Sequence, residues 1–229
     1  MKPHLDFDAV LFDLDGVLTA TSKLHAACWK QTFDALLAKL GQAPFDIERD
    51  YLEHVDGKPR LDGVRDFLAS RGIPGPTTLV RQIAERKQAL VDQALRDGGV
   101  DAFPGSVHWV RKLREAGVQT AVVSSSSNAA GVLRSAGIDR LFDEVVDGRD
   151  VERLGLRGKP APDGFLEAAA RLDVAPARAI VVEDALAGVA AGRAGRFGLV
   201  IGVARAAAPA ELLGAGADMV VEDLAEMVR

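Results

Sequence analysis

The chain has 229 residues, of which 48% are apolar and 27% charged, and its 33 acidic and 28 basic side chains give a formal net charge of −5. This length suits one α/β domain or a core with a second small domain, and the excess of acids argues against nucleic acid as a partner. Cys28 is the only cysteine, which excludes an intrachain disulfide and favours a reducing cytoplasm.

The first residues of the chain, MKPHLDFD, lack the apolar stretch of a signal peptide. No later apolar run is long enough to span a bilayer. We therefore expect a cytoplasmic protein that has no membrane partner.

A buried strand is predicted over 9–12 (AVLF), and two aspartates, Asp13 and Asp15, follow it. Side chains at positions i and i+2 of a strand point the same way. We therefore expect both carboxylates on one side of the strand end, where they repel each other. A fold accepts that repulsion when a cation or a reaction needs both groups.

Residues 21–100 are predicted to form a helical insert directly after this strand. Amphipathic helical spacing is found over 22–40, 46–55, 60–71 and 78–97. The connectors LGQAP, DGKP and RGIPGP contain glycine and proline, and the returning link DGGVDAFPG (97–105) has the composition of a hinge. We therefore expect a four-helix cap domain inserted into the chain.

The remainder of the chain alternates short apolar runs with helical patterns. Strands are predicted over 120–124, 142–146, 179–182, 198–203 and 218–221, and helices over 105–116, 129–136, 162–172 and 185–194. This alternation indicates a parallel sheet covered by helices on both faces. The predicted fold class is α/β, a doubly wound parallel sheet with a Rossmann-like core. Residues 1–20 and 101–229 would form this core, and residues 21–100 the cap.

Polar groups follow the predicted strands or lie in loops between them. They are Asp13 and Asp15, the run Ser124–Asn128 (SSSSN), Lys159, and the pair Glu183 and Asp184. Parallel strands end at one edge of a sheet, where such sheets bind ligands, so we expect these groups to form one site. Simpler interpretations exist: Asp184 as a helix N-cap, the serine run as a polar turn, and Lys159 as a solvated loop residue.

The expected combination of acids, hydroxyls and a lysine indicates phosphoryl transfer. Clustered carboxylates that stay ionised need a divalent cation, and oxygen ligands suit Mg²⁺. A lysine, hydroxyls and backbone N–H groups at a helix start would balance a bound phosphate. One aspartate can attack phosphorus and hold the group as an aspartyl phosphate, while the second transfers protons to and from the reacting oxygens.

The full chain resembles the haloacid dehalogenase-like superfamily of phosphotransferases. DLDGVL, VVSSS, GKPAPDGF and VVEDALAGVAAG match the superfamily's four motifs in order. The resemblance implies that Asp13 is the nucleophile and Asp15 the general acid/base. It also implies that Ser124 and Lys159 hold the transferring phosphate.

The same resemblance implies a Mg²⁺ site. Its ligands would be the Asp13 carboxylate, the Asp15 backbone carbonyl and acids from the Glu183–Asp184 pair. The aspartate at position 15 disfavours the dehalogenase branch of the superfamily, which lacks this acid/base.

Within the superfamily the chain most resembles the β-phosphoglucomutase family, in DGVLTATSKLHAACWK at the cap entrance and DGKPRLDGVRDFL inside the cap. The resemblance implies that His25 lies near the substrate and helps to set the protonation of Asp15. It implies that Arg60 grips the substrate's second phosphate, with help from Ser126 and Asn128 of the core. Simpler interpretations make His25 an ordinary helix residue and Arg60 a solvated cation at a helix start.

Two positions depart from the family pattern. Ser127 stands where the family often has a lysine, which removes a cation from the second phosphate site, and Lys58 could replace it. Ala20 stands where an acid often precedes the hinge threonine, here Thr21. Both departures weaken the mutase assignment more than the phosphotransferase one. Trp29 is expected to pack inside the cap.

The predicted activity is Mg²⁺-dependent interconversion of β-glucose 1-phosphate and glucose 6-phosphate, with β-glucose 1,6-bisphosphate as intermediate and activator. The expected partners are small sugar phosphates, and we expect a monomer. One alternative is a sugar-phosphate phosphatase with the same residues, in which water accepts the phosphoryl group. A more distant alternative is a signalling receiver module, which resembles the core alone and lacks the helical insert and an acid/base such as Asp15.

Overall fold

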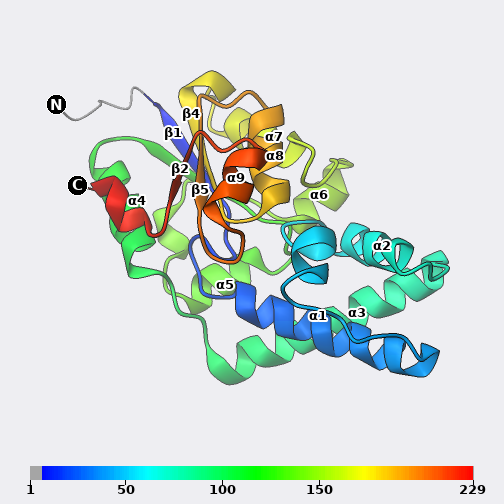
Figure 1. The fold of residues 1–229 in the computed structure, drawn as a ribbon. Helices are drawn as coiled ribbons and strands as arrows, with labels where there is room; N and C mark the ends of the chain where they lie inside the picture. The colour runs from blue at the N-terminus through cyan, green and yellow to red at the C-terminus, as the bar shows by residue number, and fades with distance from the viewer. Residues whose placement is uncertain (1–6, 229) are drawn as a thin grey trace.

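The computed structural model describes residues 7–228 and has a sheet-containing core with a group of helices at one end (Figure 1). Residues 1–6 and 229, which the predicted core includes, lie outside the described residues. Six parallel strands form one sheet in the order β3-β2-β1-β4-β5-β6. Within residues 7–228, none of the helices has the length and apolar character needed to cross a membrane.

The sheet forms from the predicted apolar runs, because strands of a parallel sheet are buried on both faces. The strands are β1 (Ala9–Phe12), β2 (Gln119–Val123), β3 (Glu144–Val146), β4 (Ala179–Glu183), β5 (Leu199–Val203) and β6 (Met219–Val221). β1 lies between β2 and β4, so the strand order reverses beside it. Ligands bind at such reversals, outside the carboxyl ends of the strands. The predicted α/β fold class is confirmed.

Helices cover both faces of this sheet. Val10 and Phe12 of β1 pack toward one face, under α4 (Pro104–Glu115), α5 (Ala129–Ser135) and the final turn η5 (Leu224–Val228). Ala9 and Leu11 pack toward the other, under α7 (Asp163–Arg171), α8 (Leu186–Ala194) and α9 (Pro209–Ala215). Short connections add α6 (Gly148–Leu154), η3 (Asp139–Leu141) and η4 (Pro176–Arg178). The sequence pattern does not predict α6 or α9.

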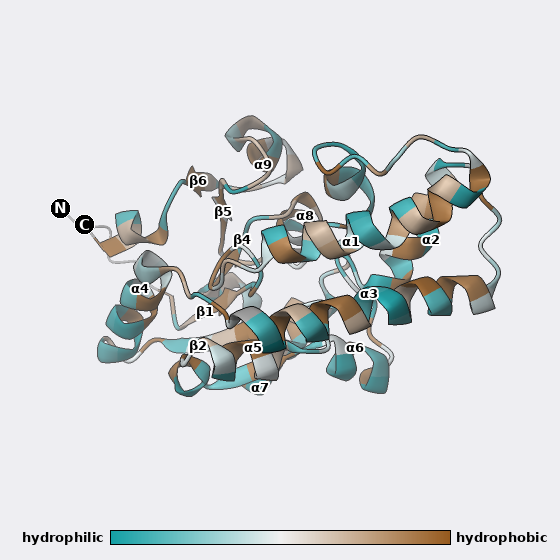
Figure 2. Ribbon diagram, turned by 90° about the horizontal axis from the view of Figure 1, so that it is seen from below, coloured by the Kyte–Doolittle hydropathy of each residue, from teal (hydrophilic) through white to brown (hydrophobic). Residues whose placement is uncertain are grey.

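The segment between β1 and α4 forms the group of helices at the end of the core. It contains α1 (Ser22–Leu37), η1 (Ala38–Leu40), η2 (Tyr51–Val55), α2 (Arg60–Ser70) and α3 (Thr77–Gly98). In Figure 2 these helices carry both hydrophobic and hydrophilic residues, as amphipathic helices do. Thirteen of their buried apolar side chains, between Ala26 and Ala84, form a cluster of their own. We infer from this cluster that residues 21–100 are a cap domain, distinct from a core of residues 1–20 and 101–229.

Aromatic rings dominate the cap cluster. The ring of Phe33 lies at centroid distances of 5.1 Å from Trp29, 5.2 Å from Phe45 and 4.1 Å from Phe67. The prediction that Trp29 packs inside the cap is confirmed, because its side chain is buried in this cluster.

The helix predicted over 46–55 is wrong in its first half. Residues 47–49 form turns, and Tyr51–Val55 is a single turn of π-helix. The Asp46 carboxylate accepts hydrogen bonds from the backbone N–H groups of Glu48 and Arg49. The Asp50 carboxylate accepts a hydrogen bond from the N–H of Asp46. Such local bonds compete with helix formation. The predicted four-helix insert therefore has three α-helices, the short π-helical turn η2 and the 3-10 turn η1.

Phe33 provides a test of the separate cap. Its side chain is 0% exposed, so Phe33→Ala should lower the free energy of unfolding of the cap by about 3–5 kcal/mol. Hydrogen exchange measured by mass spectrometry should then become faster in peptides from α1, α2 and α3, and stay unchanged in peptides from β1 and β4. Equal acceleration in both sets would contradict a cap that packs as its own unit.

Candidate active site

A tight loop after β1 carries both aspartates into one cavity. The N–H of Asp13 still pairs with a carbonyl of β4 at 2.9 Å. The carbonyl of Leu14 then accepts the N–H of Thr19 at 3.0 Å, and the N–H of Gly16 donates to the carbonyl of Thr19 at 2.8 Å. Asp13 and Asp15 both line the cavity, as predicted, but this loop places them there rather than the periodicity of the strand.

Lys159 is buried beside the cavity and joins two carboxylates. Its Nζ lies 2.5 Å from Asp13 Oδ1 and 2.5 Å from Glu183 Oε1, and it donates to the carbonyl of Val123 at 3.1 Å. Burial alone would lower the pKa of Lys159, but the two carboxylates raise it above its usual value. The ammonium is therefore protonated, and the interpretation of Lys159 as a solvated loop residue is wrong.

Three buried acids meet beside this lysine. Asp13, Glu183 and Asp184 each offer one oxygen, and these oxygens lie within 4.8 Å of one another. Burial, reinforced by the neighbouring acids, raises the pKa of Asp13 and Asp184 well above the usual value, although Lys159 opposes this for Asp13. An uncompensated set of hard oxygen donors fits Mg²⁺, and the charge of such an ion would keep the acids ionised.

The carboxylate of Asp184 packs against the backbone of Gly16. A Cβ at Gly16 would lie 1.8 Å from Asp184 Oδ2, and Gly16 has a φ of +90°. α8 begins after Ala185 without a side-chain cap, so the N-cap interpretation of Asp184 is wrong. The N–H groups of Asp184 and Ala185 bond instead to Glu183 Oε2, at 3.0 and 3.1 Å. Glu183 thus fixes this turn and Lys159, while Asp184 faces the cavity.

Asp15 is connected to the cap through a histidine. Its Oδ1 accepts a hydrogen bond from Thr21 Oγ1 and lies 3.3 Å from His25 Nε2. The other ring nitrogen, Nδ1, lies 2.6 Å from Lys87 Nζ of α3. Burial alone would raise the pKa of Asp15, but the neighbouring His25 and the hydrogen bond from Thr21 lower it below its usual value. Burial lowers the pKa of Lys87 to about 8.

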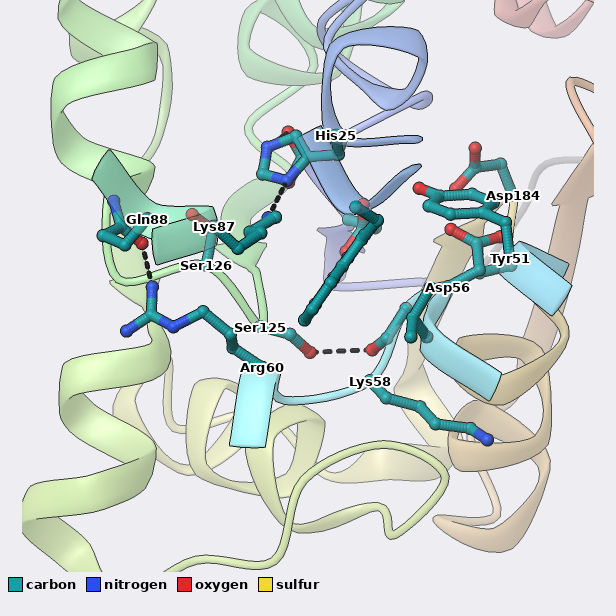
Figure 3. A pocket seen from close by; sticks show the side chains of 16 residues that line it. His25, Tyr51, Asp56, Lys58, Arg60, Lys87, Gln88, Ser125, Ser126 and Asp184 are labelled. Atoms are coloured by element: carbon teal, nitrogen blue, oxygen red, sulfur yellow. Dashed lines mark hydrogen bonds and ion pairs between the residues drawn. The ribbon is translucent and has the colours of Figure 1, made fainter. Parts of the chain in front are cut away.

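Arg60 reaches into the cavity from the start of α2 (Figure 3). Its guanidinium donates to the side-chain oxygen of Gln88. Its Nε is buried and has no hydrogen-bond partner within residues 7–228. Burial lowers the pKa of Arg60. Arg60 is therefore not a solvated helix-start cation, and it has a donor free for an anion.

The serine run after β2 forms a turn that also touches the cap. Ser124 is 2% exposed, and its Oγ accepts the N–H of Ser126 at 3.1 Å. Ser124 lines a small space beside Lys159, whereas Ser125 and Ser126 line the main cavity. Ser125 Oγ donates to the carbonyl of Gly57 in the cap at 2.7 Å. The polar-turn interpretation is thus correct for part of the run, and the turn also binds the cap.

Several cavity residues lie on the cap and carry no signal in the sequence. Tyr51, Asp56 and Lys87 line the cavity together with Gln88. Burial, reinforced by the charges of nearby acids, raises the pKa of Asp56 to about 7. In the sequence, Asp56 is part of a DG turn, and Lys87 and Gln88 are ordinary polar residues of an amphipathic helix, so only tertiary structure identifies them.

Lys58 is held by contacts within the cap. Its Nζ donates to the carbonyl of Glu53 at 2.9 Å and pairs with the Asp66 carboxylate. Figure 3 shows its side chain directed away from Arg60. The suggestion that Lys58 takes the role of a lysine at position 127 therefore has no support in this arrangement.

The cap is closed on the core. A Cβ at Gly57 of the cap would lie 2.8 Å from the side chain of Ala185, and a Cβ at Gly158 of the core 1.8 Å from that of Pro59. The cavity between cap and core measures about 60 Å³, whereas small-molecule sites occupy roughly 300–1,000 Å³. A sugar phosphate can therefore enter only if the cap opens.

Comparison with known proteins gives consistent results. A family model described as haloacid dehalogenase-like hydrolase matches residues 7–196. The chain is 47% identical to β-phosphoglucomutase of Mycobacterium bovis, covering 96% of this chain and 91% of that protein. It is 31% identical to validoxylamine A 7′-phosphate phosphatase of Streptomyces hygroscopicus subsp. limoneus, covering 96% of each. The structure of CbbY from Rhodobacter sphaeroides in complex with phosphate matches with a TM-score of 0.77 and 27% identity over 96% of both chains.

Two glycines allow a matched test of the acid cluster. Gly16 and Gly117 have φ values of +90° and +77°, so alanine strains the backbone at both, by about 1–2 kcal/mol. At Gly16 the added Cβ collides with Asp184, whereas nothing lies within 4 Å at Gly117. We expect Gly16→Ala to weaken Mg²⁺ binding about 10- to 100-fold, measured by isothermal titration calorimetry. Unchanged affinity in Gly16→Ala, or an equal loss in Gly117→Ala, would place the cation elsewhere.

Proposed function

The chain belongs to the haloacid dehalogenase-like hydrolase family, as an enzyme acting on phosphate esters, and on that premise we propose that it interconverts β-glucose 1-phosphate and glucose 6-phosphate. The observation that carries this proposal is Arg60, a cation that the cap supplies in addition to Lys159 of the core. Lys159 binds at the Asp13 end, and Arg60 enters from the cap. A mutase must bind a phosphate at each end of its bisphosphate intermediate. The similarity to the mycobacterial β-phosphoglucomutase supports the proposal.

Asp13 is the proposed nucleophile. In the first half-reaction its phosphorylated form passes the phosphoryl group to the 6-hydroxyl of β-glucose 1-phosphate. The β-glucose 1,6-bisphosphate then turns round in the site. A carboxylate oxygen of Asp13 attacks the 1-phosphate, the bond from phosphorus to O1 breaks, and glucose 6-phosphate leaves. The ion pair with Lys159 fixes the orientation of the carboxylate for this attack.

Asp15 is the proposed carrier of the proton. It takes the proton of the 6-hydroxyl as that oxygen attacks phosphorus, and later returns this proton to O1 as the bond to phosphorus breaks. Its pKa is lowered by His25 and Thr21, so the carboxylate is ionised before the first step and can act as the base. His25 and Lys87 support it from the cap.

The acid cluster would hold Mg²⁺ through the Asp13 and Asp184 carboxylates and the backbone carbonyl of Asp15. When bound, the ion supplies the positive charge that a phosphate needs beside these acids. Glu183 shares the cluster, but its oxygens bind Lys159 and two backbone N–H groups. We therefore assign Glu183 to positioning.

The second phosphate would bind between cap and core. Arg60 offers its buried Nε, and Ser126 lines the same cavity. Asn128 follows two residues later in the same turn, where its side chain reaches α3 of the cap. Ser124, beside Lys159, would bind the phosphate that is being transferred.

A sugar-phosphate phosphatase is the second candidate. The same Asp13 and Asp15 would serve, with water in place of the sugar hydroxyl. The observation that favours it is Ser127, which brings no charge to the second phosphate site where the mutase family often has a lysine. The similarity to validoxylamine A 7′-phosphate phosphatase, at 31% identity, supports it.

Arg60 separates the two candidates. A charge-assisted hydrogen bond contributes roughly 1.5–3 kcal/mol, so Arg60→Ala should slow formation of glucose 6-phosphate from β-glucose 1-phosphate by about 10- to 200-fold. Hydrolysis of p-nitrophenyl phosphate, which has no second phosphate, should change by less than about threefold. Arg60→Lys should restore only part of the mutase rate, because an ammonium cannot reproduce the guanidinium fork.

Arg65→Ala is the matched control, because Arg65 lies on the same helix and pairs with Asp62 at the surface. This variant should keep both activities. An equal fall of both activities in Arg60→Ala, or no change in either, would make Arg60 a structural residue of the cap. The phosphatase candidate would then replace the mutase.

A further inference from the structure

A carboxylate of the cap binds the same residues that the second phosphate is proposed to use. Asp92 lies on α3, and its Oδ1 accepts hydrogen bonds from Asn128 Nδ2 at 2.6 Å and from Gln88 Nε2 at 2.7 Å. Gln88 Oε1 in turn accepts a hydrogen bond from Arg60. Asn128 of the core and Arg60 of the cap are therefore joined through Asp92 and Gln88. Asp92 is the acid among these four residues.

The charge of Asp92 also acts on both cations of this region. Burial lowers the pKa of Arg60, and among the neighbouring acids Asp92 opposes that shift most strongly. Asp92 acts in the same direction on Lys87. Arg60 nevertheless keeps a buried Nε without a hydrogen-bond partner in the described part of the chain. The network thus compensates Arg60 partially and leaves one of its donors unpaired.

We propose that Asp92 is a specificity-determining residue. In the closed protein its carboxylate binds Asn128 directly and Arg60 through Gln88, and these are donors that a second phosphate needs. A phosphate arriving at Asn128 and Arg60 meets a negative charge already bonded to Asn128. It must displace that carboxylate or bind beside a like charge, and either event weakens binding. The inference rests on the proposed second phosphate site and describes how that site is tuned.

Position 127 increases the effect of Asp92. The family often adds a positive charge to this region with a lysine at this position, but Ser127 carries no charge. The site should therefore bind a second phosphate, but more weakly than the family pattern implies. Removing the charge of Asp92 should leave Arg60 and Lys87 less compensated and strengthen anion binding.

Asp97 offers a matched control on the same helix. Asp92 accepts a hydrogen bond from Gln88, four residues earlier, and Asp97 accepts bonds from Gln93 with the same spacing at 2.8 and 2.9 Å. Asp97 is exposed. Asp97→Asn thus removes the same charge from the same kind of helical pair without altering the bond to Asn128.

The test uses hexane-1,6-bisphosphonate and hexylphosphonate as competitive inhibitors of Mg²⁺-dependent p-nitrophenyl phosphate hydrolysis. Their carbon–phosphorus bonds are not transferred, so the ratio of the two inhibition constants measures the contribution of the second anionic group. The Asp92→Asn variant keeps a side-chain oxygen that can accept hydrogen bonds from Asn128 and Gln88. We expect Asp92→Asn to increase the preference for the bisphosphonate by about tenfold, and Asp97→Asn to leave it unchanged.

Three results would overturn the inference. In the first, Arg60→Ala lowers the preference for the bisphosphonate, but Asp92→Asn does not raise it. The second site then exists, and Asp92 only orients Asn128. If Asp97→Asn raises the preference as much as Asp92→Asn, the effect belongs to net charge. If both inhibitors bind equally well in the wild type and in all three variants, the second phosphate site itself is absent, and the mutase proposal fails with it.

Discussion

The structure depends on one electrostatic arrangement, a buried lysine placed between buried carboxylates. Lys159 lies 2.5 Å from both Asp13 and Glu183. Because β1 and β4 are neighbours in the sheet, their ends bring these two acids together, and Asp184 follows directly. One ammonium does not balance three carboxylates. The remaining negative charge fits a divalent cation, and a cation at this place fits a phosphate, so the chemistry of the family follows from charges that the sheet fixes.

The cap brings the complementary charges and decides what else can bind. Arg60 and Lys87 face the acidic edge of the core when the cap is closed. Burial lowers the pKa of both groups, because it removes water from their charged forms. An anion between cap and core would replace that water and would therefore be bound strongly. Contacts between cap and core cover this site, and such a cover would protect an aspartyl phosphate from water. Asp92 weakens this attraction at the end that the second phosphate is proposed to occupy.

The sequence predicted the sheet and the members of the acid cluster well, because both are encoded locally. Apolar runs of four to six residues mark the strands, and the acids follow them directly. Asp184 shows where local reading fails: an acid before a helix suggests an N-cap, and only its contact with Gly16 shows that it faces the cavity. Lys87 and Asp92 could not be found, since helical spacing identifies an apolar face but not which polar residue meets another domain. The helix predicted from residue 46 failed because aspartate side chains there bind the backbone.

We propose that a sugar hydroxyl, and not water, receives the phosphoryl group of Asp13. Phosphorus-31 NMR of the reaction in ¹⁸O-labelled water tests it directly, because ¹⁸O bonded to phosphorus shifts the resonance. With β-glucose 1-phosphate, Mg²⁺ and a trace of the bisphosphate, we expect glucose 6-phosphate whose phosphate carries no ¹⁸O. Inorganic phosphate carrying ¹⁸O as the main product, with little glucose 6-phosphate, would contradict it.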